Sequence, residues 1–279
     1  MIQLSQLPVA ELKQVIGPRA AAAVEDIRIA LNDPAVAKRP ELLVPPATTE
    51  GQAAELRLLH GLAESRTALT PAKRADAERF TELMDHHGGG KLLVGTDPSK
   101  TYHTPAEPTL WETWAARQGQ AGVDLLHKMD AIGDIGWMVP KQAVDQPRPK
   151  AIFPGLDTIG ISPPNSSWPS GHTYQQRFRY RTLMQMQPED AARFRRTSEQ
   201  LPISRLYAGQ HWPNNVLAAA HFADAAHADV WSAHVRGASV QDMQGIMHAH
   251  AERNVALFKR HAGPTDFGPR LLELAGVAS

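Results

Sequence analysis

The sequence predicts an all-α protein. Residues 119–138 place Val123, Leu126, Met129, Ile132 and Ile135 at intervals of three, which is the pattern of an amphipathic helix. No segment shows the alternation of apolar and polar residues that is typical of a half-buried strand. The 279-residue chain is 42% hydrophobic, which is enough for a sizeable core in one large domain or two small ones.

Helical patterns recur along the chain, with breaks at proline and glycine. Four prolines predict an irregular connection over 33–50, and three glycines at 88–90 end a helix. The helices are expected over 9–31, 51–66, 71–86, 119–138, 171–186, 188–199, 214–235, 239–261 and 268–276. We expect residues 1–279 to form a single compact helical domain, with 1–40 as an N-terminal arm and the functional core in about 108–235.

Composition and charge argue against several functional classes. Lys+Arg and Asp+Glu both number 29, and the resulting zero net charge argues against a nucleic-acid coat or a polybasic membrane anchor. The absence of cysteine excludes disulfides, thiolate catalysis and Cys-ligated zinc. No segment approaches the roughly 20 apolar residues that span a bilayer, and the first residues lack a signal-peptide pattern. We expect a soluble, cytoplasmic protein that binds neither nucleic acid nor a membrane.

Three short stretches carry candidate functional residues. They are KQAVDQPRP over 141–149, WPSGHTY over 168–174 and SRLYAGQH over 204–211. The members of these stretches that suggest chemistry are Lys141, Arg148, Ser170, Gly171, His172, Arg205 and His211.

These residue types suit a tetrahedral oxyanion. Arginine offers a planar fork for two oxygens, and lysine offers a compact charge. The backbone N–H groups after Pro169 are expected to open a helix and to point at an anion. Two histidines allow one to attack and the other to donate a proton. Plain structural roles are the alternatives, above all a helix cap at Ser170 and a packing role at Ser204.

The three stretches resemble the three-part signature of the type 2 phosphatidic acid phosphatase superfamily. This superfamily includes soluble bacterial class A acid phosphatases, membrane lipid phosphatases and vanadium haloperoxidases. The parts are Lys-x6-Arg-Pro, Pro-Ser-Gly-His and Ser-Arg-x5-His, separated here by nineteen and thirty-one residues, as is usual in the family. The signature covers 141–215, and a looser likeness to the class A members reaches back to about residue 41. The resemblance implies a compact helical bundle like that of the class A enzymes.

The resemblance also implies metal-independent hydrolysis of a phosphate monoester. His211 would form a phosphohistidine, and His172 would protonate the leaving group and then activate water. The phosphate oxygens would be held by Lys141, Arg148 and Arg205 together with backbone groups of Ser170 and Gly171. No cofactor is expected, and the partner is a small-molecule phosphate ester. The identity of that ester and the formation of a homo-oligomer stay open.

Asn215 departs from the family pattern. The family has an aspartate at this place, four residues after the second histidine, which orients the histidine through Nδ1 and stabilises the imidazolium. Asparagine can accept the same hydrogen bond without supplying charge, whereas a reversed amide would donate to Nδ1. We expect Asn215 to lie within hydrogen-bond reach of His211 Nδ1. If the neutral partner limits the reaction, Asn215→Asp is predicted to raise turnover by up to roughly 10⁴, by analogy with a serine protease.

Other functions are compatible with the same residues. A divergent member of the superfamily would bind a phosphorylated ligand without turnover or catalyse another step. A vanadium haloperoxidase would hold vanadate as its cofactor, with His211 as the apical ligand. His221, Asp224 and His227, like the pair at 86–87, are alternative metal candidates, although packed or solvated roles are expected for them. Trp168 and Trp212 are expected to pack in the core or to wall the substrate entrance.

Overall fold

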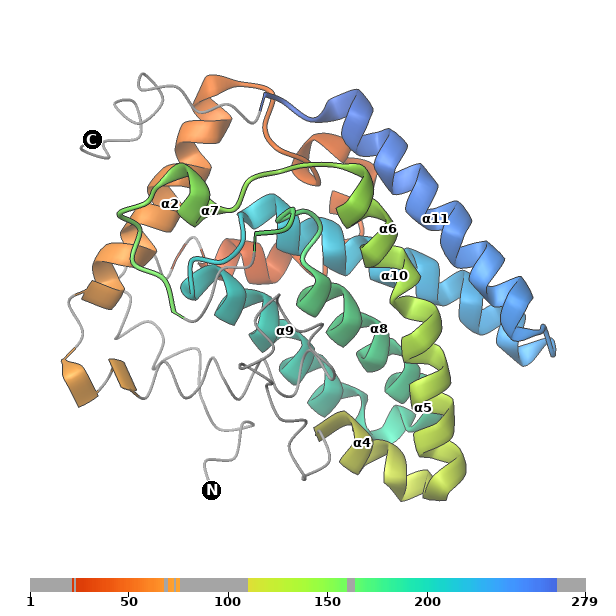
Figure 1. The fold of residues 1–279 in the computed structure, drawn as a ribbon. Helices are drawn as coiled ribbons and strands as arrows, with labels where there is room; N and C mark the ends of the chain where they lie inside the picture. The colour runs from red at the N-terminus through yellow and green to blue at the C-terminus, as the bar shows by residue number, and fades with distance from the viewer. Residues whose placement is uncertain are drawn as a thin grey trace.

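The computed structural model describes residues 22, 24–67, 70–72, 74–75, 110–159 and 164–264. Every regular element in these residues is an α-helix or a short 3-10 helix, so the all-α prediction is confirmed for this part of the chain (Figure 1). The predicted helix over 268–276, the histidine pair at 86–87, and most of the predicted helix over 71–86 and of the arm over 1–40 lie outside the described residues. None of the described helices is both long enough and apolar enough to cross a membrane.

The α-helices are α2 (Thr49–Thr67), α4 (Leu110–Ala115), α5 (Gly119–Gly133), α6 (Ile135–Ala143), α7 (Pro149–Ile152), α8 (Gly171–Met186), α9 (Ala191–Tyr207), α10 (Pro213–Val235) and α11 (Val240–His261). The 3-10 helices are η2 (Val36–Lys38), η3 (Pro40–Leu42), η4 (Ala116–Gln118) and η5 (Pro188–Asp190). Helices α2, α8, α10 and α11 match the predicted segments to within two residues.

Two predicted boundaries were wrong. The helix expected over 119–138 is divided into α5 and α6 at Asp134, whose carboxylate accepts a local hydrogen bond from Trp137 Nε1 at 2.9 Å. The Asp134 backbone itself stays in the right-handed helical region, and the chain continues as helix to Ala143. The helix expected over 188–199 instead becomes α9, which extends to Tyr207 and contains Pro202. Burial of both turns around this proline stabilises a helix that the local sequence rule would end.

The arrangement of the helices brings the three motif stretches together. Helix α8 packs against α5, α9 and α10, while α11 packs along α6 and α10 (Figure 1). Apolar side chains of α8, α10 and α11 form the centre of the main core, which includes Phe178, Val216 and Met247. The first motif is at the end of α6, the second precedes α8, and the third joins α9 to α10. The functional residues therefore come from helix ends that a packed core holds in place.

Candidate functional site

Backbone hydrogen bonds join the three motif stretches. The Ser167 N–H donates to the Gln146 carbonyl at 2.8 Å, which ties the second stretch to the first. The Ser170 N–H donates to the Asn215 carbonyl at 3.1 Å, which ties the start of α8 to the start of α10. The motif side chains are therefore close in space although up to 70 residues separate Lys141 from His211.

Arg148 lies at the centre of the site. Its guanidinium is buried and donates to the Gln210 carbonyl at 3.0 Å and to Asn165 Oδ1 at 2.7 Å. The same Nη1 that bonds Gln210 also lies 3.4 Å from His211 Nε2. Burial lowers the pKa of Arg148 to about 10, so the group is still charged at neutral pH.

Lys141 and Arg205 add two further cations. Lys141 Nζ donates to the carbonyl oxygens of Ser166 at 2.7 Å and Pro169 at 2.8 Å, beside the second motif. Burial, and then the charge of Arg148, lower the pKa of Lys141 well below its ordinary value. Arg205 is fully buried and donates to the side-chain oxygen of Gln210. Burial lowers its pKa to about 10.

No carboxylate of the described residues pairs with Lys141 or Arg148. Their hydrogen-bond acceptors are backbone carbonyls, the Asn165 amide and a histidine nitrogen. A buried charge without an opposite charge is unfavourable, because its interactions with water have been lost. The site is therefore electrostatically suited to an anion.

The surroundings of His211 select one tautomer. Nδ1 lies 2.9 Å from the Ser167 carbonyl, which can only accept, and Nε2 faces Arg148, which can only donate. Nδ1 therefore carries the proton, and the lone pair of Nε2 points toward the cations. Burial, followed by the charges of Arg148 and Lys141, lowers the pKa of His211 well below its ordinary value. The imidazole is neutral and has the tautomer that a nucleophile needs.

His172 is the second histidine of the site. Its Nε2 is buried and has no hydrogen-bond partner. Burial, and then the charges of Arg148 and Lys141, lower the pKa of His172 to about 4. Because buried polar atoms in native proteins nearly always have partners, this nitrogen is a candidate contact for a bound ligand.

Asn215 lies next to His211, as the motif spacing predicts. Its Oδ1 is 3.4 Å from His211 Nδ1 and accepts from the Trp212 N–H at 3.1 Å. Its Nδ2 donates to Gln146 Oε1 at 2.8 Å and to Asn214 Oδ1 at 2.7 Å. These partners oppose the reversed amide, since reversal would place an acceptor against two acceptors. The Ser167 carbonyl is the closer partner of His211, so Asn215 is not its only orienting group.

Ser170 and Gly171 form the start of α8. Ser170 Oγ caps the helix by accepting from the Thr173 N–H at 3.4 Å, and its own N–H is bonded to Asn215. The Trp137 ring packs against Gly171 so closely that a Cβ there would lie 2.9 Å from Trp137 Cε3. Glycine is therefore required for this helix start to approach α6. Ser204 Oγ bonds the Leu201 carbonyl at 2.8 Å, which is the structural role expected for it.

The sequence reasoning missed several residues of the site. Gln146 and Gln210 lie inside the motif stretches, at positions that the signature leaves variable. Asn165 and the Ser167 carbonyl lie just before the second motif. Glu55, which accepts three hydrogen bonds from Asn214, lies on α2 and carries no sequence signal that connects it to the motifs.

The alternative metal candidates have other partners. Asp224 is held by Arg177 and Arg181, His221 Nε2 lies 2.9 Å from the Ala30 carbonyl, and His227 Nε2 lies 3.2 Å from the Thr182 hydroxyl. Among the described residues, no three acidic or histidine side chains are grouped as metal ligands.

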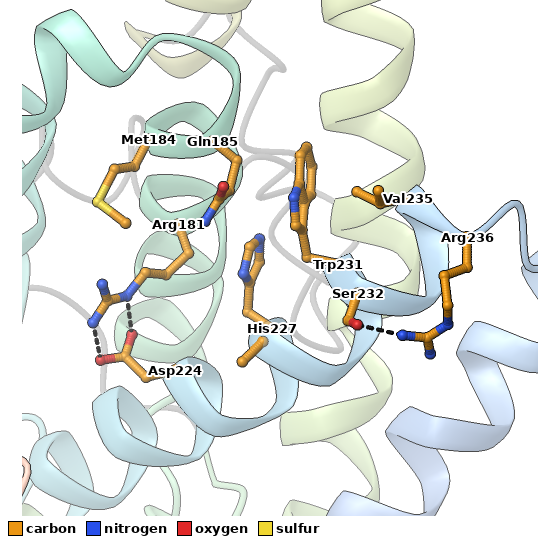
Figure 2. A pocket seen from close by; sticks show the side chains of 10 residues that line it. Arg181, Met184, Gln185, Asp224, His227, Trp231, Ser232, Val235 and Arg236 are labelled. Atoms are coloured by element: carbon orange, nitrogen blue, oxygen red, sulfur yellow. Dashed lines mark hydrogen bonds and ion pairs between the residues drawn. The ribbon is translucent and has the colours of Figure 1, made fainter.

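Asp224 and His227 instead line an open groove of 620 Å³ between α8 and α10, together with Trp231 (Figure 2). The motif residues do not line this groove. Trp168 and Trp212 are both fully buried, so they pack in the core rather than wall an entrance.

Models of known protein families gave no match to this chain, and neither did the comparison with proteins of curated function. The resemblance to the phosphatase superfamily therefore rests on the three motifs, and the function has to be argued from the geometry of the site.

Proposed function

We propose that the protein hydrolyses a phosphate monoester through a phosphohistidine on His211. The observation that carries this proposal is the pair of buried cations, Lys141 and Arg148, that lack an acidic partner among the described residues and lie beside two neutral histidines. A phosphate dianion supplies the missing negative charge. Phosphoryl transfer relies mainly on positioning and charge stabilisation, which such a site provides.

In the first step, His211 Nε2 attacks phosphorus. A P–N bond forms, the P–O bond to the leaving alcohol breaks, and protonated His172 gives its proton to the leaving oxygen. Arg148 lies 3.4 Å from Nε2, so an oxyanion bound by this guanidinium is within reach of the nucleophile. Lys141, Arg205 and the Gly171 N–H hold the remaining oxygens. The Ser170 N–H is omitted from this set because it is bonded to Asn215.

In the second step, neutral His172 takes a proton from water as its oxygen attacks phosphorus. The P–N bond breaks, its electron pair returns to Nε2, and inorganic phosphate is released. His172 needs to be protonated in the first step, and its pKa of about 4 in the free protein is too low for this at neutral pH. Burial, and then the neighbouring cations, depress this pKa, and a bound dianion offsets the effect of the cations, so we expect substrate binding to raise the pKa of His172.

The test uses two phosphate esters with different leaving groups. We expect His211→Ala to reduce turnover of both esters to background, because it removes the nucleophile. His172→Ala should lower turnover of an alkyl phosphate by roughly 10² to 10⁴ and that of an activated aryl phosphate less, since a good leaving group needs no proton. His248→Ala, on the exposed face of α11, is the matched control.

Further measurements separate the mechanism from its alternatives. Labelled substrate should leave an acid-labile phosphoenzyme in the wild type and none in His211→Ala. Vanadate should compete with substrate, because its bipyramidal form imitates the transition state, and chelators should leave turnover unchanged. A requirement for added divalent metal would contradict the proposal. Turnover of halide and peroxide after addition of vanadate would instead favour the haloperoxidase.

A second candidate function is anion binding without turnover. The observation in its favour is that both oxygens facing His211 Nδ1, from Ser167 and Asn215, belong to neutral groups. Neutral acceptors orient the imidazole but stabilise an imidazolium less than a carboxylate does. Tight phosphate binding with no turnover of any phosphate ester would favour this candidate.

A further inference from the structure

Glu55 of α2 ends a hydrogen-bonded chain that leads to His211. Its carboxylate accepts from the Asn214 backbone N–H at 3.2 Å and from Asn214 Nδ2, which lies 2.9 Å from Oε1 and 2.8 Å from Oε2. Asn215 Nδ2 donates to Asn214 Oδ1 at 2.7 Å, and Asn215 Oδ1 faces His211 Nδ1 at 3.4 Å. We propose that Glu55 is a positioning residue for His211 that acts through Asn214 and Asn215. This inference rests on the proposed function, in which His211 is the nucleophile.

The donors and acceptors of this chain have one consistent arrangement. The ionised form of Glu55 only accepts, so above its pKa of about 7 Asn214 turns its NH₂ to Glu55 and its Oδ1 to Asn215. Asn215 then turns its NH₂ to Asn214 and to Gln146 Oε1, which takes the second hydrogen at 2.8 Å. The oxygen of Asn215 is left for His211 Nδ1–H. Glu55 thereby fixes which end of the Asn215 amide the nucleophile meets.

A neutral amide at position 55 would remove this consistency. It offers one acceptor where Glu55 offers two, so its NH₂ would face the NH₂ of Asn214. Rotation of the Asn214 amide relieves this conflict only by setting its NH₂ against that of Asn215. Rotation of Asn215 as well would set a donor against the Nδ1–H of His211 and the backbone N–H of Trp212. The conflict moves along the chain, and at least one donor stays without an acceptor.

Glu55 is also unfavourable for stability, which argues for a functional reason to keep it. No lysine or arginine of the described residues pairs with its carboxylate, whose partners are groups of Asn214. Burial, only partly offset by these hydrogen bonds, raises the pKa of Glu55 to about 7. The carboxyl group therefore binds a proton more readily in the folded than in the unfolded state, and the free energy of unfolding falls as the pH rises from the ordinary carboxyl pKa to about 7. Residues that lower stability are concentrated at functional sites.

The test compares Glu55→Gln with Glu64→Gln, a control at an exposed position of the same helix. We expect Glu55→Gln to lower kcat roughly 10-fold to 100-fold, the range seen when the supporting partners of functional histidines are removed. The Kd for inorganic phosphate should be unchanged, because the cations that hold the anion are intact. The Tm at pH 8 should change little, since removal of a buried charge offsets the donor that loses its acceptor. A large loss of Tm would assign Glu55 a structural role and overturn the proposal.

The double variant Glu55→Gln/Asn214→Asp reverses the order of amide and carboxylate. The new carboxylate accepts from Asn215 Nδ2 and from the new amide, so every donor again has an acceptor. We expect kcat to return to near the wild-type value. Unchanged kcat in Glu55→Gln, or a double variant as slow as the single one, would also overturn the proposal.

Nitrogen-15 NMR of His211 distinguishes failure of this proposal from failure of the proposed function. It reports the hydrogen bonding of Nδ1 without any turnover. If the wild type hydrolyses no phosphate ester, the proposed function fails. A change in the Nδ1 chemical shift in Glu55→Gln that is reversed in the double variant would then still support the role of Glu55. An unchanged Nδ1 shift in Glu55→Gln would in that case overturn the role.

Discussion

Two groups of cations, one along α8 and one beside its start, differ in their partners. Along α8, Arg177 and Arg181 both bind Asp224 of α10, with N–O distances of 2.8 and 2.6 Å, and the Arg181 pair is visible at the edge of the groove in Figure 2. At the start of α8, Lys141 and Arg148 have no carboxylate among the described residues.

The pKa values of Arg181 and Arg148 move in opposite directions. Hydrogen bonds to Asp224 raise the pKa of Arg181, whereas burial lowers the pKa of Arg148 to about 10. Burial tends to raise the pKa of Asp224, but its bonds to Arg181 and Arg177 outweigh this and hold it below the ordinary value. The arginines of α8 are thus neutralised within the protein and serve the fold. The cations of the motifs have no such carboxylate among the described residues, so the negative charge can come from a ligand.

The largest expected contrast between the two groups is in catalysis. Arg148→Ala should lower kcat/KM by roughly 10² to 10³, the usual loss when one group that stabilises developing negative charge is removed. Its Tm should change little, because an uncompensated buried charge is lost together with its hydrogen bonds. The measurement is kcat/KM on an aryl phosphate, with thermal unfolding on the same preparation. A variant that loses its fold without a change in kcat/KM of the folded fraction would contradict the contrast.

The reverse result is expected on the structural side. Arg177→Ala leaves Asp224 with one of its two arginines, and removal of one partner of a buried pair typically costs about 3–5 kcal/mol. We therefore expect a clear drop in the denaturant midpoint, with kcat per folded molecule unchanged. Arg117→Ala, which breaks the exposed ion pair to Asp190, is the control for a cation of little importance to stability. Equal losses of stability in Arg177→Ala and Arg117→Ala would contradict the larger contribution expected of the buried Arg177 pair.

An added anion should stabilise the folded protein, and it should do so by binding at the motif site alone. Sulfate at 100 times its Kd is expected to add about 2.7 kcal/mol to the free energy of unfolding, and Arg148→Ala should abolish most of this gain. Bound sulfate raises the lowered pKa of His172, so binding takes up a proton and strengthens as the pH falls. One proton taken up corresponds to about tenfold in Kd per pH unit. Calorimetry at pH 8 and pH 5 measures this change, and a Kd independent of pH would contradict it.

Asn215→Asp is expected to have the smallest effect. The spacing of the motif alone predicts a gain of up to roughly 10⁴, but the NH₂ of Asn215 donates to Gln146 and Asn214 at 2.8 and 2.7 Å. A carboxylate would set an oxygen against both acceptors and add a second negative charge near Glu55. We therefore expect kcat to change by less than about tenfold in either direction. A rise of 10³ or more would show that the neutral partner limits His211 and that Gln146 and Asn214 reorient freely.

Part of the candidate site is local in the sequence. Residues 141–149, 168–174 and 204–211 carry their residue types and spacings in the chain itself, so the cations and the two histidines could be predicted without a structure. The same holds for α8 and α11, whose starts carry the capping residues Ser170 and Ser239. Prediction from the local sequence failed at Pro202, because the burial that keeps α9 helical there depends on neighbours distant in sequence.

The sequence by itself determined the helical class, the three motifs and the proximity of Asn215 to His211, since four residues at a helix start bring two side chains together. Only the tertiary structure decided the charge balance and the tautomer. Whether a cation has an acidic partner depends on which helices pack beside it. The sequence around Lys141, Arg148 and Arg177 does not record that only Arg177 has one among the described residues. The acceptor for His211 Nδ1 is the Ser167 carbonyl, and Glu55 reaches the site from 159 residues before Asn214. Backbone carbonyls and distant carboxylates leave no pattern along the chain, because packing in three dimensions alone brings them to the site.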